Sequence, residues 1–306
     1  MAQPTGVIRD AAMSSPLSKA SSAQQGQEQP RPWFLRGRFW GTVCFYVAIG
    51  FFILNILGLV GTVIIDSFGT HWFGGTWLPQ GFTTDWYAFE THDHNIVSLL
   101  FNTLFIAVSV TLIALAVGFG AAYVLARKEF RFKGALTILY LLPMLLPPLV
   151  YGIPLATVLL QYLGGALPSV ILINLVPVVP FVILILRPFI EQIDVSLESA
   201  SRMLGANRLQ TFWRVMLPLV TPGLLTAGIL AMVRTIAMFE LTFLVADANT
   251  QTLVVVLYSD AFAAGIRPNQ AVDAMAVIYT LTTMAMVIIA LIFVKPTQFV
   301  VRLKKT

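Results

Sequence analysis

Long hydrophobic stretches with almost no charge recur along the chain and are separated by shorter polar segments. Crossing a bilayer as a helix takes roughly 20 mostly apolar residues. The stretches do not alternate apolar and polar residues, as the strands of a membrane barrel would. The pattern therefore predicts an all-α membrane protein with six transmembrane helices. The predicted spans cover about 39–65, 97–126, 135–160, 168–187, 219–246 and 272–294.

The composition supports a membrane protein over a soluble one. Of the 306 residues, 58% are hydrophobic and only 11% are charged. Soluble domains are about 45–50% apolar and about 25% charged. A soluble fold could not hide this much apolar surface, because its exterior must carry enough polar side chains to face water. The composition thus excludes a cytosolic enzyme, a secreted domain and a disordered chain.

Basic residues gather in alternate connections between the predicted spans. Every Lys and Arg except Arg234 and Arg267 lies in the N-terminal tail, in 127–134, in 187–218 or in the C-terminal tail. Cytoplasmic loops of membrane proteins carry such an excess. We therefore expect both termini in the cytoplasm. The net charge of +5 is then a signal of topology and does not indicate a nucleic-acid partner.

The pattern divides the chain into three parts. Residues 1–30 are rich in Ala, Ser, Gln and Pro, a composition that cannot bury enough surface to become ordered. We expect a flexible cytoplasmic tail over 1–38, a six-span domain over 39–294 and a basic cytoplasmic tail over 295–306.

The sequence offers no constellation for catalysis. It has no nucleotide-binding Gly-x-x-x-x-Gly-Lys loop and no His-Glu-x-x-His helix, and Cys44 is its only cysteine. His92, Asp93 and His94 are adjacent, but their spacing matches no strong metal motif, so we predict no metal site. The chain is expected to be no enzyme and to hold no cofactor. If it moves a solute uphill, another subunit or an ion gradient must supply the energy.

The connection 187–218 has signals for a structured helix. Asp194 is a plausible N-cap for a helix over 195–204, because Asp side chains accept hydrogen bonds from the first free amides of a helix. Gly205 is placed to end that helix in the left-handed conformation.

A second helix is predicted immediately afterwards. Asn207 and Gln210 have the spacing of a capping box, and Pro218 is expected to mark the turn into the fifth span. A helix–Gly–helix element between two spans favours a docking surface for a cytoplasmic partner. The other interpretation of the residues is an amphipathic helix that lies on the lipid surface.

These residues resemble a known signature. Leu197–Ala206, followed by Val215-x-Leu217-Pro218, is similar to the cytoplasmic Glu-Ala-Ala loop of ABC importer permeases. The resemblance extends over about residues 40–295 and implies a type I importer permease in a bacterial inner membrane. Segments similar to the polyamine-type permeases of this group are Gly81–Tyr87, Phe239–Phe243 and Thr250–Leu253.

The resemblance implies partners and roles. The loop of such permeases sits in a groove of an ATPase subunit, which binds ATP and Mg. The implied assembly holds two ATPase subunits, a second permease or a copy of this one, and a periplasmic binding protein. Ser199 occupies the position of the loop glutamate, with Glu198 one residue earlier. The coupling role is carried over to Glu198, Ala200, Gly205, Leu217 and Pro218.

Prolines and charges inside spans indicate a transport path. Broken helices often line substrate sites in transporters, although simple kinking is an equal interpretation. Arg234 and Glu240 fall within the fifth predicted span, where a charge is costly and usually functional. We hypothesise that they belong to the substrate pathway, with a structural ion pair as the other interpretation. The prolines concerned are Pro143, Pro147, Pro148, Pro154, Pro177 and Pro180.

These observations lead to one functional prediction. We expect a permease subunit of an ATP-driven importer that works by alternating access. Glu240 favours a polyamine-like or other amine-bearing solute. The competing hypothesis is a self-contained, ion-driven secondary transporter, which would not need a helix–Gly–helix docking loop.

Overall fold

The computed structural model describes residues 37–70, 72, 76, 78–262 and 267–293. The expected tails 1–38 and 295–306 lie outside this part, apart from residues 37 and 38. The chain divides into two compact units, Met1–Leu59 and Val60–Thr306. The described residues of the first unit belong to one helix, α1 (Gly37–Ser67), which continues into the second unit. All contacts discussed below lie within the second unit.

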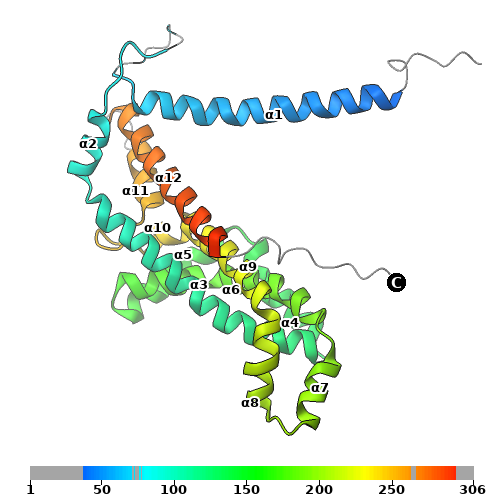
Figure 1. The fold of residues 1–306 in the computed structure, drawn as a ribbon. Coiled ribbons are helices and arrows are strands. Elements are labelled where there is room, and N and C mark those ends of the chain that lie inside the picture. Colours follow the sequence, from blue (N-terminus) through cyan, green and yellow to red (C-terminus); the bar gives the residue numbers. More distant parts are fainter. Residues whose placement is uncertain (1–36, 71, 73–75, 77, 263–266, 294–306) are drawn as a thin grey trace, which may run out of the picture. The chain divides into compact units, whose positions relative to one another are not determined.

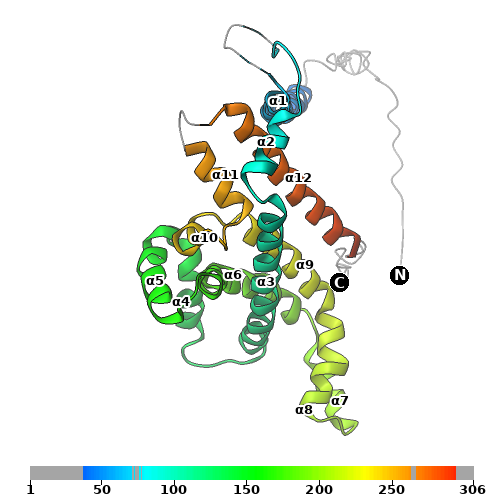
Figure 2. The ribbon, with the colours of Figure 1, turned by 90° about the vertical axis from the view of Figure 1, so that its left-hand side faces the viewer.

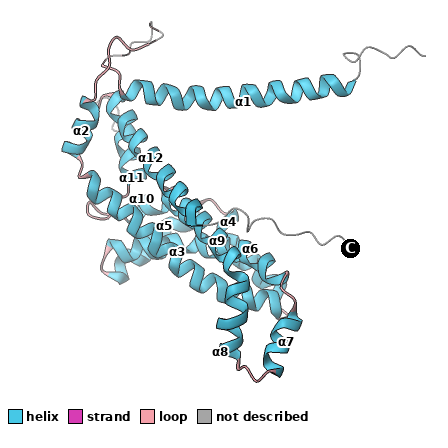
Figure 3. Cartoon of the chain, viewed as in Figure 1, coloured by secondary structure: helices cyan, strands magenta, loops and turns pink. Residues whose placement is uncertain are grey.

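The described part of the chain is built from helices, and its only β feature is an isolated bridge between Gly69 and Phe82 (Figure 3). Five helices are long and apolar enough to cross a membrane, and the number is six if the bent pair of α4 and α5 counts as one span. The predicted all-α, multi-span fold is therefore confirmed. The elements after α1 are α2 (Asp85–Asp93), α3 (Ile96–Arg127), α4 (Lys133–Leu145), α5 (Pro148–Leu163), α6 (Ala166–Glu191), α7 (Val195–Met203), α8 (Arg208–Thr211), η3 (Phe212–Met216), α9 (Leu217–Ile236), α10 (Glu240–Val245), α11 (Leu253–Phe262) and α12 (Asn269–Phe293).

The third predicted span, 135–160, is not one helix. It consists of α4 and α5, which meet at an angle of 94°. Leu146 and Pro147 have extended backbone angles between the two helices. The cause is local, because a proline disfavours the helical conformation of the residue before it, and Pro147 and Pro148 are consecutive. Pro148 then opens α5 at a position where its missing N–H costs nothing.

The fifth predicted span, 219–246, is also interrupted. α9 ends at Ile236, and α10 begins at Glu240. The last turn of α9 tightens where the Met238 amide bonds to the Thr235 carbonyl. Met238 turns into the core and is 7% exposed. The expectation that Arg234 and Glu240 share one helix is therefore wrong, since the break separates them.

Pro218 does not mark a turn, which corrects a second prediction. The helix continues from Arg208 to Ile236 through the π-helical turn η3. In this wider turn the Leu217 amide bonds to the Phe212 carbonyl, five residues back. A π turn opens the backbone just before Pro218, which has no amide to donate and whose ring needs room. The second helix of the 187–218 connection and the fifth span are thus one continuous rod.

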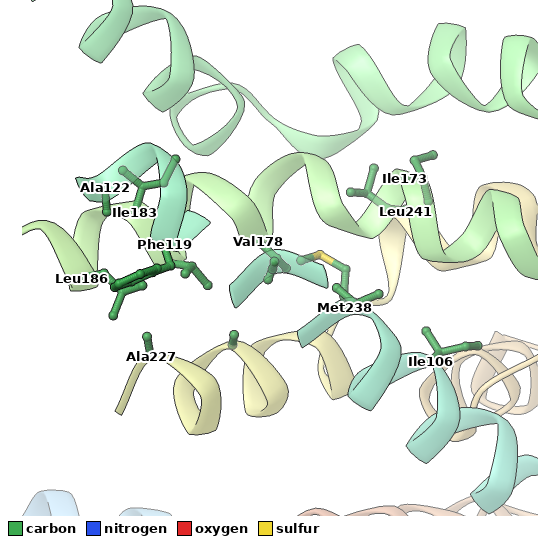
Figure 4. Close-up of a cluster of buried hydrophobic side chains, with 14 of the residues drawn as sticks. Ile106, Phe119, Ala122, Ile173, Val178, Ile183, Leu186, Ala227, Met238 and Leu241 are labelled. Atoms are coloured by element: carbon green, nitrogen blue, oxygen red, sulfur yellow. The ribbon is translucent and has the colours of Figure 1, made fainter. Parts of the chain in front are cut away.

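The core of the second unit lies where α3, α6 and α9 pack on one another (Figure 2). Figure 4 shows their side chains meeting, with Phe119 of α3, Leu186 of α6 and Ala227 of α9 among them. α6 is the most enclosed of the spans, and its Val178 and Leu186 are completely buried. Small residues allow such close helix approach in membranes. Gly118 of α3 is one of them, and it faces Val182 of α6.

Gly118→Ala is expected to destabilise the bundle. A Cβ at this position would lie 2.7 Å from Val182 Cγ1, and overpacking of this kind costs about 1–3 kcal/mol. Gly120→Ala is the matched control, because nothing lies within 4 Å of the added carbon. Thermal unfolding in detergent should show a lower midpoint for Gly118→Ala only. Equal midpoints for the two variants would contradict the packing described here.

Candidate functional site

The 187–218 connection forms a compact helical hairpin at one end of the second unit (Figures 1 and 2). Asp194 caps α7, and its side chain accepts a 2.8 Å hydrogen bond from the Ser196 amide. That bond lowers the pKa of Asp194 below its ordinary value. Gly205 has a φ of 86°, a left-handed conformation that favours glycine. Both predictions are confirmed, although α7 ends one residue earlier than expected.

The second half of the hairpin is held by its own bonds. Asn207 and Gln210 form the predicted capping box, with side-chain-to-amide distances of 2.8 and 2.9 Å. The hydroxyls of Ser201 and Thr211 lie 2.9 Å apart and join α7 to α8. The connection is therefore a defined structural element with a fixed tip at Gly205.

The tip of the hairpin presents apolar side chains to the outside. Met203 is 83% exposed and Leu204 is 89% exposed. Ser199, Ala200 and Gly205 are exposed as well. An exposed apolar patch of this kind marks an interaction surface. Of the remaining predicted coupling residues, Leu217 is half-buried and Pro218 is exposed, and both lie where η3 joins α9.

Glu198, by contrast, points inward and fixes α7 to α3. It is 4% exposed. Its Oε2 accepts a 2.7 Å hydrogen bond from the Tyr123 hydroxyl. Arg127 Nε lies 2.9 Å from Oε1, and Arg202 of α7 contributes a longer pair at 3.6 Å. We call Glu198, Tyr123 and Arg127 the loop clamp.

Sequence reasoning placed Glu198 in the coupling loop but missed its partners. Tyr123 and Arg127 are four residues apart in the last turns of α3, so they share one face of that helix. That spacing is the one feature of the sequence that could have identified these two residues as a pair on the same helix face. The contact itself joins residues 75 positions apart, and only the packed fold brings them together.

The other predicted functional residues lie around the break between α9 and α10. The Arg234 guanidinium stacks over the Phe181 ring of α6, 5.0 Å from its centroid, in the geometry of a cation–π contact. Glu240 is the first residue of α10. Among the described residues, neither Arg234 nor Glu240 takes part in an ion pair.

α5 and α6 complete the surroundings of this break. Tyr151 of α5 lines a hollow of about 460 Å³ between α4, α5 and α6. α5 lies close against α10, because a Cβ at Gly152 would be 2.7 Å from Leu241. Asn174 of α6 donates a 3.0 Å hydrogen bond to the Thr242 hydroxyl. α5, α6 and α10 therefore pack together next to this break.

A charged cluster lies at the end of the unit opposite the hairpin, where α2 meets α11 and α12. Arg267 pairs with Glu90 at 2.8 Å, with Asp260 at 3.2 Å and with Asp93. Glu90 is completely buried, and burial raises its pKa against the opposing charge of Arg267. His94 Nε2 lies 3.0 Å from Asp260.

This charged cluster brings possible metal ligands together. Glu90, His94 and Asp260 place one ligand atom each within 4.8 Å of one another. The sequence singled out His92, Asp93 and His94 and predicted no metal site. Of those three, only His94 belongs to this group. Arg267 already supplies the positive charge at its centre.

Comparisons with known proteins point to one family. Residues 114–297 match the model of the binding-protein-dependent transport system inner membrane component. The molybdate/tungstate transport system permease protein of Pyrococcus abyssi is 31% identical over 58% of this chain and 72% of its own length. The spermidine/putrescine transport system permease protein of Escherichia coli K12 is 27% identical over 83% of this chain and 91% of its own.

Solved structures agree on the fold. A crystal structure of a bacterial ABC transporter involved in the import of the acidic polysaccharide alginate matches with a TM-score of 0.65 and 21% identity. The match covers 84% of this chain and 96% of that one. A complex of a bacterial alginate ABC transporter with a periplasmic protein matches with a TM-score of 0.68 and 14% identity, over 88% and 99% of the two chains.

Glu198→Gln is expected to loosen α7 from α3. Glutamine keeps the volume and can still accept from Tyr123, but Arg127 loses its opposite charge in a buried position. The Tyr123 hydrogen bond also loses its charged acceptor. A hydrogen bond to a charged group contributes about 1.5–3 kcal/mol, and the free energy of local opening of α7 should fall by that order. Hydrogen exchange of the α7 amides measures it.

The matched control is Glu191→Gln, which makes the same change in the same connection. Glu191 is an exposed residue that pairs with Arg187 at 2.7 Å. Surface changes of this type stay within about 0.5 kcal/mol. Equal exchange of α7 in both variants would show that the loop clamp does not hold the helix.

Proposed function

Because this chain belongs to the family of binding-protein-dependent transport system inner membrane components, we propose that it forms the path along which an ATP-driven importer carries a small, amine-bearing solute. Members of the family are multi-pass inner membrane permeases of ABC importers, and they are not enzymes. The ATPase of such a system is a separate subunit.

The observation that carries the proposal is the hairpin of α7 and α8. Its tip is apolar and exposed, and the loop clamp joins its base to α3. Such a hairpin suits the transmission of force better than it suits simple attachment to lipid. A partner that binds Ala200 and the Gly205 turn and then moves would displace α3 through Glu198. It would also pull on the fifth span directly, since α8, η3 and α9 form one rod.

Leu217 and Pro218 have a different role in this proposal. They lie where η3 joins α9. Single π turns inside α-helices are rare and are frequent at functional sites. We assign to these two residues the joint at which the rod bends when the hairpin is pulled.

The proposed assembly follows from this arrangement. Two ATPase subunits bind ATP with Mg at the hairpin end, which faces the cytoplasm together with both termini. A second permease, or a copy of this one, completes the path. A periplasmic binding protein delivers the solute at the opposite end. Closure of the ATPase pair opens the path outward, and hydrolysis returns it to the inward-open state.

The solute is proposed on the basis of Glu240. A carboxylate within a span, unpaired among the described residues, favours a positively charged group. The spermidine/putrescine permease named above is a relative that supports an amine. The molybdate/tungstate permease is a relative named for an oxyanion, so the family by itself does not decide the charge of the solute.

Purification from the native membrane in mild detergent tests the proposed function. We expect an ATPase subunit to copurify with the chain, and Gly205→Leu to reduce its yield by tenfold or more, because a side chain is strained at this φ and distorts the tip. Gly164→Leu is the matched control. Gly164 also has a positive φ, 66°, but it ends α5, far along the chain from the hairpin.

Two outcomes would count against the proposal. Equal loss of the ATPase in both glycine variants would show that binding of the ATPase does not depend on the hairpin tip in particular. A chain that purifies alone and transports in response to an ion gradient in liposomes would be a secondary transporter instead.

A further inference from the structure

Three buried polar atoms without hydrogen-bond partners lie on the helices that meet at the α9–α10 break. They are the Tyr151 hydroxyl, Asn174 Oδ1 and Arg234 Nε. Asn174 is completely buried. A buried polar atom without a partner destabilises the fold, and native proteins rarely leave one unexplained. These three atoms lie on adjoining elements, α5, α6 and α9.

The same place holds two opposite charges that do not pair with each other. Arg234 lies in the last turn of α9, and Glu240 lies in the first turn of α10. Tyr151 of α5 precedes Gly152, where an added Cβ would lie 2.7 Å from Leu241, the residue after Glu240. A purely structural role would be served best by a direct bond between them, because charges at membrane depth are costly. Their separation leaves one attachment point of each sign.

The side chains have the chemistry of two distinct subsites. The Arg234 guanidinium, held in place by the Phe181 ring, offers a planar fork of donors that suits a carboxylate or a similar oxyanion. The Glu240 carboxylate and Asn174 Oδ1 are acceptors and suit the N–H groups of an ammonium. The Tyr151 hydroxyl can donate or accept and serves either group.

We propose that the α9–α10 break binds a zwitterionic solute, with its acidic group at Arg234 and its ammonium group at Glu240. The inference rests on the proposed function and narrows its solute from any amine to one that also carries an acidic group. A diamine would leave Arg234 unpaired and facing a like charge. A dicarboxylate would leave Glu240 unpaired and facing a like charge. Only a solute with both groups satisfies both residues.

The assembled transporter, purified without its binding protein, is the material for the test. The probes are three matched series with two to four backbone carbons: ω-amino acids, α,ω-diamines and α,ω-dicarboxylates, all at 10 mM and equal ionic strength. The readout is the thermal unfolding midpoint. We expect at least one ω-amino acid to raise the midpoint by several degrees, and no diamine or dicarboxylate of the same length to do so.

Variants connect the effect to the two residues. Arg234→Gln and Glu240→Gln should each abolish the stabilisation by ω-amino acids, and Glu240→Gln should gain stabilisation by dicarboxylates. Lys133→Gln and Glu129→Gln are matched controls, because they neutralise an exposed pair at the start of α4. Both controls should keep the response of the native chain.

The outcomes separate this inference from the proposed function. ATP hydrolysis by the same preparation reports whether the chain works in an importer, whatever the probes do. No response to any ω-amino acid, or an equal response to diamines, overturns the zwitterion site while ATP turnover persists. Variants that lower the midpoint without any probe and leave no probe response would instead show Arg234 and Glu240 paired with a neighbouring subunit.

Discussion

The proposed coupling depends on the contacts that the buried carboxylate of Glu198 makes with Tyr123 and Arg127. A hairpin of two short helices has too little apolar surface of its own to hold a fixed direction. Glu198 fixes it, because a buried carboxylate must keep its hydrogen-bond donor and its opposite charge, and these are Tyr123 and Arg127 of α3. Buried ion pairs often add little net stability, but breaking one is costly. The clamp therefore gives α7 one orientation and makes displacement of the hairpin a displacement of α3.

Breaks in the helices shape the proposed transport path. The α4–α5 break at Pro147 and the tightened turn after α9 are both irregular backbone, and the helices that follow them, α5 and α10, pack together. Irregular backbone within a membrane persists only where protein or a cavity satisfies it. Tyr151, Asn174 and Arg234 lie in this region with unused bonding capacity. The α8–η3–α9 rod connects the hairpin to the break at its far end, so motion at one reaches the other.

Much of this architecture could be predicted from the sequence, because hydrophobic length and capping chemistry act locally. The spans, the Asp194 cap, the left-handed Gly205 and the Asn207 capping box follow from residues within a few positions of one another. Two predictions were wrong: that Pro218 marks a turn, and that 219–246 is one continuous helix. The π turn before Pro218 and the buried position of a methionine after α9 depend on the surrounding packing, which no local pattern specifies. The clamp and the Arg267 cluster join residues far apart in sequence, and no local pattern specifies their contact.

The most direct test of the central claim is the number of ATP molecules hydrolysed per solute carried by the reconstituted transporter. Glu198→Gln should keep most of its ATP hydrolysis but carry several-fold less solute, because the hairpin then moves without α3. Glu129→Gln, an exposed carboxylate next to the end of α3, should leave the ratio unchanged. A Glu198→Gln transporter with the native ratio would contradict the claim that the clamp passes motion from the hairpin to the spans.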